Sequence, residues 1–261
     1  MNPFKTILSL VLILSLTVVA CSDDSDDNGE DVDPSDFPLE ALLNEEQSFM
    51  IVAVEEFGEE FDAYMSMMIL EDHDNVTLKI DGNDVSLSSF FGFYFADLDL
   101  MPEQSFSFEL TVDGNSRSGS LSIPAVVQGT FPSEFDLSSD YSLSWTTSSD
   151  PTGFIAFLQI ELEDDWIDQG NMLSGSERSH TFNRGIYSGL SEDDIWYVDV
   201  GVLSMNFTIK DNMIFLAGFD AYQDYDFDAD FTFKQTDRNV DADRPRGRFP
   251  AMIMNRKKSA Q

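Results

Sequence analysis

Sulfur and imidazole chemistry are nearly absent from this chain of 261 residues. It contains one cysteine, Cys21, and two histidines, His73 and His180. A single cysteine excludes disulfides within the chain and metal sites built from several thiolates. Zinc-binding histidine pairs, P-loops and the common nucleophile and dinucleotide motifs do not occur in the sequence. We therefore expect stability to come from packing, and no motif singles out an enzyme.

Basic residues are also scarce, with 14 Lys and Arg against 49 Asp and Glu and a formal net charge of −35. Eight of the 14 follow Phe233, namely Lys234, Arg238, Arg244, Arg246, Arg248, Arg256, Lys257 and Lys258. Such an acidic body repels nucleic acid and anionic membrane surfaces. It attracts cations or basic partners, or it serves solubility in a saline habitat. The basic tail either docks on the acidic face of its own chain or on anionic lipopolysaccharide, or it is a frayed terminus.

Long apolar runs are limited to Ile7–Ala20, which is 14 residues. A membrane-spanning helix needs about 20 residues. Lys5 precedes this run, and small residues lead from it into Cys21. A positive start, a short apolar core and a small-residue cleavage site predict an export signal.

The residues Val18-Val19-Ala20-Cys21 resemble the lipobox of bacterial lipoproteins. This resemblance implies cleavage before Cys21 and attachment of a diacylglyceryl group and an N-acyl chain to it. Several acyl chains together anchor a protein stably. The following stretch, Ser22–Asp27, resembles the acidic export signal of Bacteroidota-type surface lipoproteins. The implied location is the cell outer membrane, with the body facing the medium.

The chain divides by composition into five segments. Acidic and Ser-rich residues after Cys21 predict a disordered tether, and Phe37–Gln47 predicts a short helix. The predicted segments are the signal peptide 1–20, the acidic tether 21–47, a first β-sandwich 48–124, a second β-sandwich 125–236 and a basic tail 237–261.

The body has the pattern of strands separated by turns. Apolar and polar residues alternate through Phe106–Val112, and Asp81-Gly82, Asp113-Gly114 and Lys210-Asp211-Asn212 supply turn signals. The β-rich stretch Ile195–Ile209 is long enough for one strand or two. These patterns predict an all-β fold of one or two antiparallel immunoglobulin-like sandwiches.

Two segments resemble known β modules. Tyr141–Trp145, followed by Asp150–Gly153 and the strand from Phe154, resembles the start of a fibronectin type III module. The hairpin at residues 80–82 and the strand at 106–112 resemble bacterial immunoglobulin-like modules. The resemblance implies a spacer or a binding platform, although fold alone does not assign function.

Alternating aspartates form the sharpest candidate site: Asp224, Asp226, Asp228 and Asp230. On a strand, alternate side chains share one face, about 6.6 Å apart. The aromatic residues between them then face the core. The face is either a calcium site completed by oxygens from another loop or a solvated acidic strand.

The three tryptophans have separate interpretations. The patterns around Trp145 and Trp196 predict core positions, whereas Trp166 follows three acids in a polar stretch. Trp166 is either a sugar-stacking platform or a partly buried loop anchor. Carboxylate pairs for glycoside hydrolysis depend on separation in space, which sequence does not give.

Together these patterns favour a noncatalytic surface module for binding, adhesion or assembly, assisted by calcium if the aspartates bind it. The alternative is a glycan-capturing lipoprotein of a nutrient uptake system, with Trp166 as the discriminating residue. An extracellular hydrolase based on paired carboxylates has the least support. The expected partners are the membrane, through the lipid, and a surface protein or glycan, with no nucleic acid.

Overall fold

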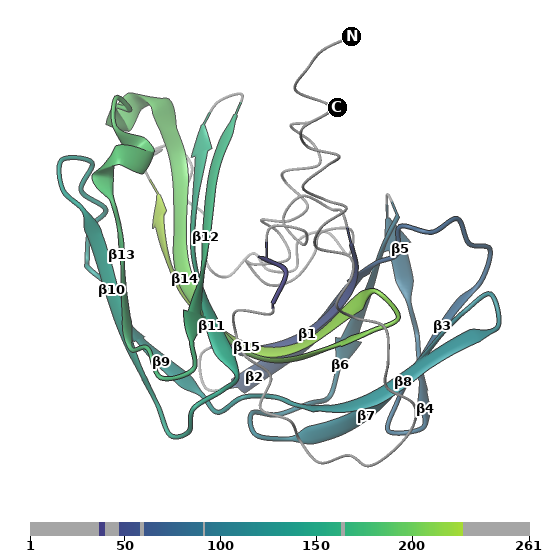
Figure 1. The fold of residues 1–261 in the computed structure, drawn as a ribbon. Helices are drawn as coiled ribbons and strands as arrows, with labels where there is room; N and C mark the ends of the chain where they lie inside the picture. Colours follow the sequence, from purple (N-terminus) through teal and green to yellow (C-terminus); the bar gives the residue numbers. More distant parts are fainter. Residues whose placement is uncertain (1–36, 40–46, 58–59, 91, 163–164, 227–261) are drawn as a thin grey trace, which may run out of the picture. The chain divides into compact units, whose positions relative to one another are not determined.

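The computed structural model describes residues 37–39, 47–57, 60–90, 92–162 and 165–226 (Figure 1). The chain divides into two units, Met1–Asp31 and Val32–Gln261, and the described residues all belong to the second. The signal peptide, Cys21 and the basic tail lie outside the described residues, as does most of the helix predicted after residue 37. No helix in the described ranges has the length and apolar character of a membrane span.

The described chain is built almost entirely of strands in three sheets, which confirms the all-β prediction. The large sheet has the order β12 (Trp166–Ser174), β11 (Gly153–Leu162), β14 (Ile195–Lys210), β15 (Met213–Asp226), β1 (Ser48–Phe57), β2 (Glu60–Met68), β6 (Phe93–Leu98) and β5 (Ser88–Phe90). The second sheet is β13 (Ser179–Phe182), β10 (Tyr141–Thr147) and β9 (Val127–Thr130). The third is β4 (Asn83–Val85), β3 (Val76–Ile80), β7 (Ser105–Val112) and β8 (Asn115–Ser122). Two 3₁₀ turns, η2 (Arg184–Tyr187) and η3 (Glu192–Asp194), precede β14.

One strand pairing joins the two halves of the sequence. β1 pairs with β15 in parallel, from Ser48 opposite Met213 to Glu55 opposite Asp220, while the other described pairings are antiparallel. The predicted boundary between residues 124 and 125 therefore does not separate two sheets. The large sheet contains strands from both predicted ranges, and the division into one or two sandwiches stays a prediction.

Tight turns connect the hairpins where the sequence predicts them. Asp81 and Gly82 have φ values of 49° and 78°, and Asp113 and Gly114 have 48° and 83°. Asp211 and Asn212 adopt the same left-handed region between β14 and β15. Two consecutive positive φ values fit the twist of a two-residue hairpin, and Gly, Asn and Asp tolerate them best.

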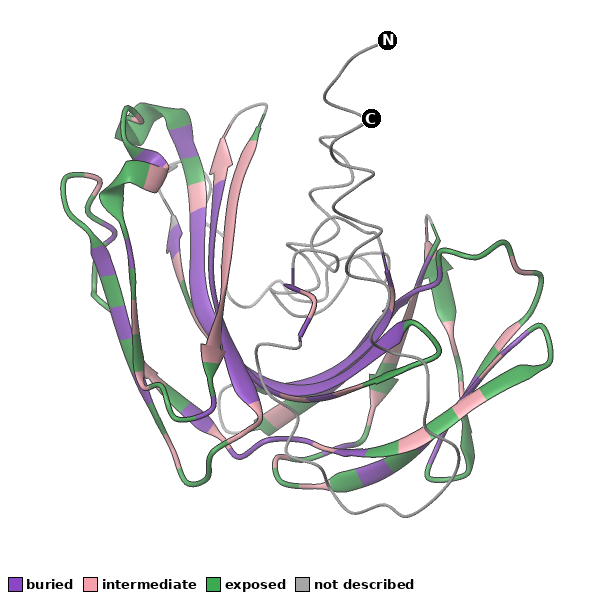
Figure 2. Cartoon of the chain, viewed as in Figure 1, coloured by how far each residue is buried: buried purple, intermediate pink, exposed green. Residues whose placement is uncertain are grey.

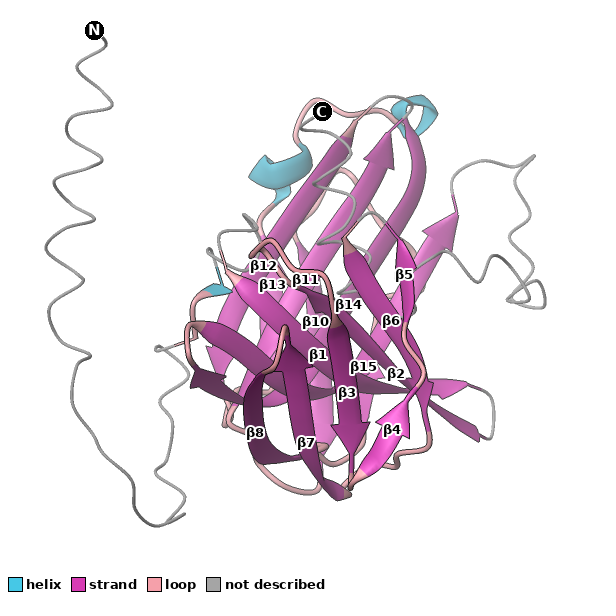
Figure 3. Cartoon of the chain, turned by 90° about the vertical axis from the view of Figure 1, so that its right-hand side faces the viewer, coloured by secondary structure: helices cyan, strands magenta, loops and turns pink. Residues whose placement is uncertain are grey.

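The main hydrophobic core lies between the large sheet and the two smaller ones. In Figure 3, β7 and β8 of the third sheet are seen in front of the large sheet. The Phe108 ring of β7 stacks on the Phe215 ring of β15 with centroids 4.4 Å apart, and Asn206 of β14 donates to the Ser122 carbonyl of β8 at 2.9 Å. Trp145 of β10 is 2% exposed, which confirms its predicted core position. β1, β11, β14 and β15 are buried along most of their length (Figure 2). Strands covered on both faces need nearly continuous apolar sequence.

Trp196 corrects one prediction, because 46% of this side chain is exposed. Glu161 of β11 pairs with Tyr197, but Leu162 pairs with Ile195, so the register shifts at Trp196. Such a bulge leaves one residue unpaired in the ladder and turns its neighbours. The alternation that predicts a core position therefore breaks at this residue.

A cluster of aromatic rings fixes the end of β15. The Tyr141 hydroxyl donates to the Tyr225 hydroxyl at 2.7 Å, because the Tyr225 hydroxyl itself donates to the Pro132 carbonyl. The Phe135 ring stacks on Tyr141 with centroids 5.2 Å apart. Burial raises the pKa of both tyrosines above the ordinary value of the phenol group, and the larger rise is that of Tyr141. Because Tyr225 points into this core, Asp224 must lie on the opposite face of the strand.

Candidate functional site

The second face of the large sheet carries its own apolar cluster. It includes Phe49 and Ile51 of β1, Leu203 and Met205 of β14, and Leu216 of β15, all of them buried. Phe37 and Leu39 pack on this cluster, and the Phe37 ring lies 4.8 Å from the Phe207 ring. Toward the other end of β14, this face changes from apolar to acidic.

Carboxylates gather at that end, one or two on each of several neighbouring strands. We call this surface the acidic face and define it by Glu55, Asp168, Asp199, Asp220 and Asp224. Asp199 is opposite Asp224 in the β14–β15 register, and Glu55 is opposite Asp220 across β1 and β15. The Gln159 amide of β11 donates to Asp168 of β12 at 2.9 Å. Strand alternation places these side chains on the same side of the sheet as Leu203 and Leu216.

Three of these carboxylates are deeply buried. Glu55 is 5% exposed, Asp199 is 3% exposed and Asp220 is 2% exposed. Removing a carboxylate from water costs several kcal/mol unless a cation or several hydrogen bonds compensate it. The acidic face therefore requires positive charge or strong donors close to it.

The basic residues that the structure describes lie elsewhere. Arg117 of β8 is within 3.9 Å of both Glu71 and Asp211. Lys79 is opposite Glu109 between β3 and β7. The remaining three are Arg178 beside Asp150, Arg184 in η2, and Lys210, which donates to the Ser118 carbonyl at 2.8 Å.

The predicted calcium site is only partly within the described residues. Asp224 is half-buried on the acidic face, and Asp226 ends β15. Asp228 and Asp230 lie outside the described residues, so calcium binding by the four aspartates stays a prediction. Within the described ranges, no three Asp, Glu, His or Cys side chains converge as metal ligands.

The aromatic candidates for sugar stacking, Trp166 and Trp196, lie two strands apart in the large sheet. Trp166 begins β12, is partly exposed and lies opposite Glu161 of β11. Glu161 is in turn opposite Tyr197 of β14, next to the exposed Trp196. The sequence singled out Trp166 and missed Trp196, because the bulge that exposes Trp196 depends on the neighbouring strand.

A hollow of about 480 Å³ lies beside β12 and β13. It is lined by Phe37, Pro38, Leu39, Gly170, Asn171, Met172, Leu173 and His180. Burial lowers the pKa of His180, which keeps its ring neutral at pH 7. His73 is held elsewhere, 2.6 Å from the Tyr94 hydroxyl. The structure thus does not bring the two histidines together.

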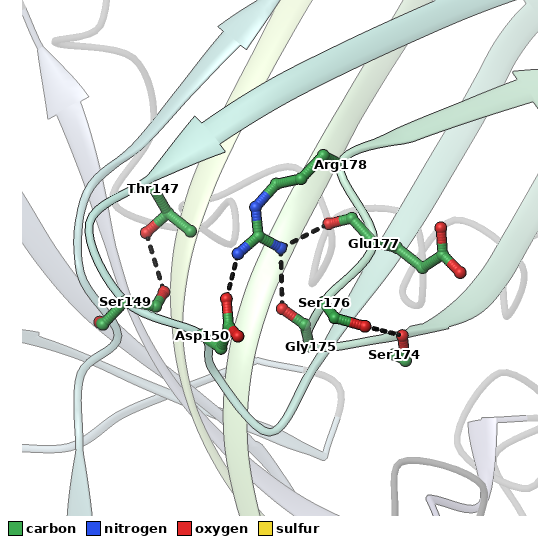
Figure 4. Close-up of polar contacts among 8 residues, drawn as sticks. All are labelled: Thr147, Ser149, Asp150, Ser174, Gly175, Ser176, Glu177 and Arg178. Carbon is green, nitrogen blue, oxygen red and sulfur yellow. Dashed lines mark hydrogen bonds and ion pairs between the residues drawn. The ribbon is translucent and has the colours of Figure 1, made fainter.

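Arg178 joins the loop before β11 to the loop after β12 (Figure 4). Its guanidinium donates to the carbonyls of Gly175 and Glu177 at 2.8 and 2.7 Å, and it pairs with Asp150. The same group lies 5.5 Å from the centre of the Phe154 ring. Because the donors are used within the protein, we interpret Arg178 as a clamp between loops and not as a ligand-binding residue.

Sequence reasoning missed the most deeply buried carboxylates. Asp199 interrupts the apolar run of β14 and Asp220 interrupts that of β15. A single acid within an apolar strand is the signal that could have found them, since such a residue needs a specific partner. Their grouping with Glu55 depends on the β1–β15 pairing, which no local pattern predicts.

Comparisons with known proteins give likenesses of fold only. No protein-family model matches the chain, and no curated protein matches it. Solved structures similar to it include a two-domain fibronectin type III segment of chicken tenascin, at 10% identity and a TM-score of 0.26, covering 67% of this chain and 97% of that one. The fibronectin(III)-like modules of Clostridium thermocellum CbhA match at 9% identity and a TM-score of 0.23, covering 66% and 92%. The FN1–FN3 domains of chicken CNTN1 match at 15% identity and a TM-score of 0.22, covering 68% and 64%. At these TM-scores, the likeness carries no conclusion about function.

Proposed function

We propose that this chain is a noncatalytic binding module, held outside the cell by lipid on Cys21, and that its acidic face takes a basic polypeptide segment. The observation that carries the proposal is the burial of Glu55, Asp199 and Asp220 on one face of the sheet. These acids adjoin an apolar surface around Leu203 and Leu216. A polypeptide with basic and apolar side chains matches both halves of this face.

A basic segment fits this face better than calcium alone. Calcium takes six to eight oxygens at about 2.3–2.6 Å, which requires carboxylates that converge. The acids here are spread over neighbouring strands, about 4.7–4.9 Å apart. Guanidinium groups along an extended chain can meet carboxylates spaced in this way, each with two parallel hydrogen bonds.

Binding of octaarginine to the purified full chain tests the acidic face, with fluorescence anisotropy as the readout. A charge-assisted hydrogen bond contributes about 1.5–3 kcal/mol, so Asp199→Asn with Asp220→Asn should weaken binding by roughly 100-fold in protein that near-UV circular dichroism shows to be folded. The matched control is Asp84→Asn with Glu109→Gln, which removes the same charge from exposed positions on β4 and β7. Equal weakening by both double variants would mean that the peptide responds only to net charge.

Anchoring through Cys21 has its own experiment. Cells that express the full chain are labelled with palmitate, and the N-terminal peptide of the purified protein is weighed by mass spectrometry. The acylated cysteine should be the first residue, and Cys21→Ser should abolish the label. An unmodified thiol at this position would contradict the anchoring and leave the octaarginine result intact.

Glycan capture is a second candidate, favoured by the exposure of Trp196 beside the acids of η3. Aromatic faces next to carboxylates can stack on sugars and hydrogen-bond their hydroxyl groups. Retention on insoluble polysaccharides should then fall for Trp196→Ala or Trp166→Ala. Retention that is equal for both variants and the native chain would remove this candidate.

A further inference from the structure

The outer edge of β12 is the longest strand edge that the described part of the chain leaves open. β12 has nine residues and ends the strand order of the large sheet, where β11 is its one partner among the described strands. The other outermost strands are β4 and β5 with three residues each, β9 and β13 with four, and β8 with eight. Proteins commonly protect an edge from pairing with another chain by shortness, Lys or Pro. β12 has none of these three features.

The hollow of about 480 Å³ adjoins this edge. Its lining includes four consecutive residues of β12, 170–173, and on another side residues 37–39. Met172 packs on the apolar cluster of the second face, and Asn171 and His180 supply polar groups to the lining. A mostly apolar hollow beside a strand edge suits the side chain of an added strand, because such strands are selected by pockets for alternate side chains.

Alternation along β12 determines which side chains an added strand meets on one face, namely those of Asp168, Gly170 and Met172. Asp168 and Met172 are four residues apart, which is about 13 Å along a strand. Gly170 between them has no side chain, and an aromatic side chain opposite a glycine at a sheet edge covers the backbone that the glycine leaves bare. The edge therefore matches a basic, an aromatic and an apolar side chain at alternate positions of a partner segment.

Charge decides which kind of chain fits this edge. A second copy of the same chain brings like charges together, because each copy carries a formal net charge of −35. A segment with Lys or Arg is instead attracted by Asp165 and Asp168, one just before β12 and one within it. The occupant that this edge fits is thus an extended basic segment of another protein.

We propose that the partner segment adds as a further strand to the outer edge of β12, with a basic side chain opposite Asp168 and an apolar side chain in the hollow beside Met172. This inference rests on the proposed function and names the way in which the basic segment binds. Main-chain hydrogen bonds to β12 hold the segment, and its alternate side chains give the selectivity. Asp168 belongs to both the edge and the acidic face, so further basic residues at that end of the segment reach the acidic face.

Fluorescence anisotropy with the purified full chain and labelled peptides tests the strand addition. The probes are Thr-Arg-Thr-Phe-Thr-Leu-Thr and its reverse, for parallel and antiparallel pairing. The control, Thr-Thr-Arg-Phe-Leu-Thr-Thr, has the same composition and charge without the alternation. The tighter probe should bind at least about tenfold more tightly than the control, since it presents the three side chains at the spacing of the edge. Equal affinity of probes and control would overturn the strand addition.

Methylation of the peptide nitrogens tests the main-chain pairing in the native protein. Every second amide of an added antiparallel or parallel strand faces its neighbour. In the tighter probe, one set of nitrogens is that of Arg, Phe and Leu, and the other is that of the Thr residues between them. Methylating one set should weaken binding at least about tenfold, and methylating the other should leave it within about twofold. Equal loss from both sets, or no loss from either, would overturn the proposal.

A pair of protein variants places the probe on β12. Met172→Lys puts a cation into the hollow, and the control Ile209→Lys adds the same charge at an exposed apolar residue near the end of β14. In folded protein, Met172→Lys should weaken the tighter probe at least about tenfold more than Ile209→Lys does. Equal effects would overturn the strand addition at this edge. If octaarginine binding still depends on Asp199 and Asp220 in that case, the proposed function stands without this mode of binding.

Discussion

Asp220→Asn should destabilise the protein strongly, although the exchange keeps the size and shape of the side chain. Asp220 is 2% exposed and lies opposite Glu55 and Leu203 on neighbouring strands. An ionised carboxylate at such a position is compensated by its partners, and removing its charge leaves those partners uncompensated. Breaking a buried ion pair on one side costs about 3–5 kcal/mol. For a body of roughly 200 residues, this corresponds to a fall in Tm of about 6–20 °C.

Urea unfolding at pH 7, followed by tryptophan fluorescence, measures the free energy of unfolding of both proteins. Asp84→Asn on β4 is the matched control, since an exposed substitution of the same type should change stability by less than about 0.5 kcal/mol. A variant at position 220 that is as stable as the native chain, or more stable, would refute the reasoning. It would mean that the buried carboxyl is neutral and that the acidic face holds no paired cation.

Three further predictions concern the framework that holds this face. Tyr225→Phe removes the hydroxyl between Tyr141 and a backbone carbonyl, and should lower the free energy of unfolding by about 1–3 kcal/mol in urea. Burial raises the pKa of Tyr141, Tyr187 and Tyr225, so the unfolded chain loses these protons first. The contribution of these tyrosines to stability should be constant below about pH 10, and stability should fall above it, as followed by near-UV circular dichroism and tyrosinate absorbance. Arg178→Ala should cost about 1 kcal/mol, because its pair with Asp150 is partly solvated, and Arg178→Lys should recover only part of the loss. An unchanged urea midpoint in the Tyr225 or Arg178 variant, or alkaline stability that rises with pH, would contradict the corresponding statement.

Local patterns predicted most of the strands and turns. The alternation in β7 and the Asp-Gly turns at 81–82 and 113–114 each depend on a few consecutive residues, so they can be read without knowledge of the rest of the chain. β12 was missed, because Trp166–Ser174 lacks clear alternation and forms a strand by pairing with β11. The predicted strand from Asp224 is the end of β15, since pairing with β14 continues through Asp226.

The sequence by itself determined the all-β class, the hairpin turns, the core position of Trp145 and the separation of an acidic body from a basic tail. Only the tertiary structure decided that β1 lies parallel to β15, and this pairing brings Glu55 beside Asp220 across 165 positions of sequence. It also decided that Trp196 faces solvent, through a bulge set by the partner strand. The reason is physical: a period of two fixes which side chains of a strand share a face, but the choice of neighbouring strand depends on the burial of the whole sheet.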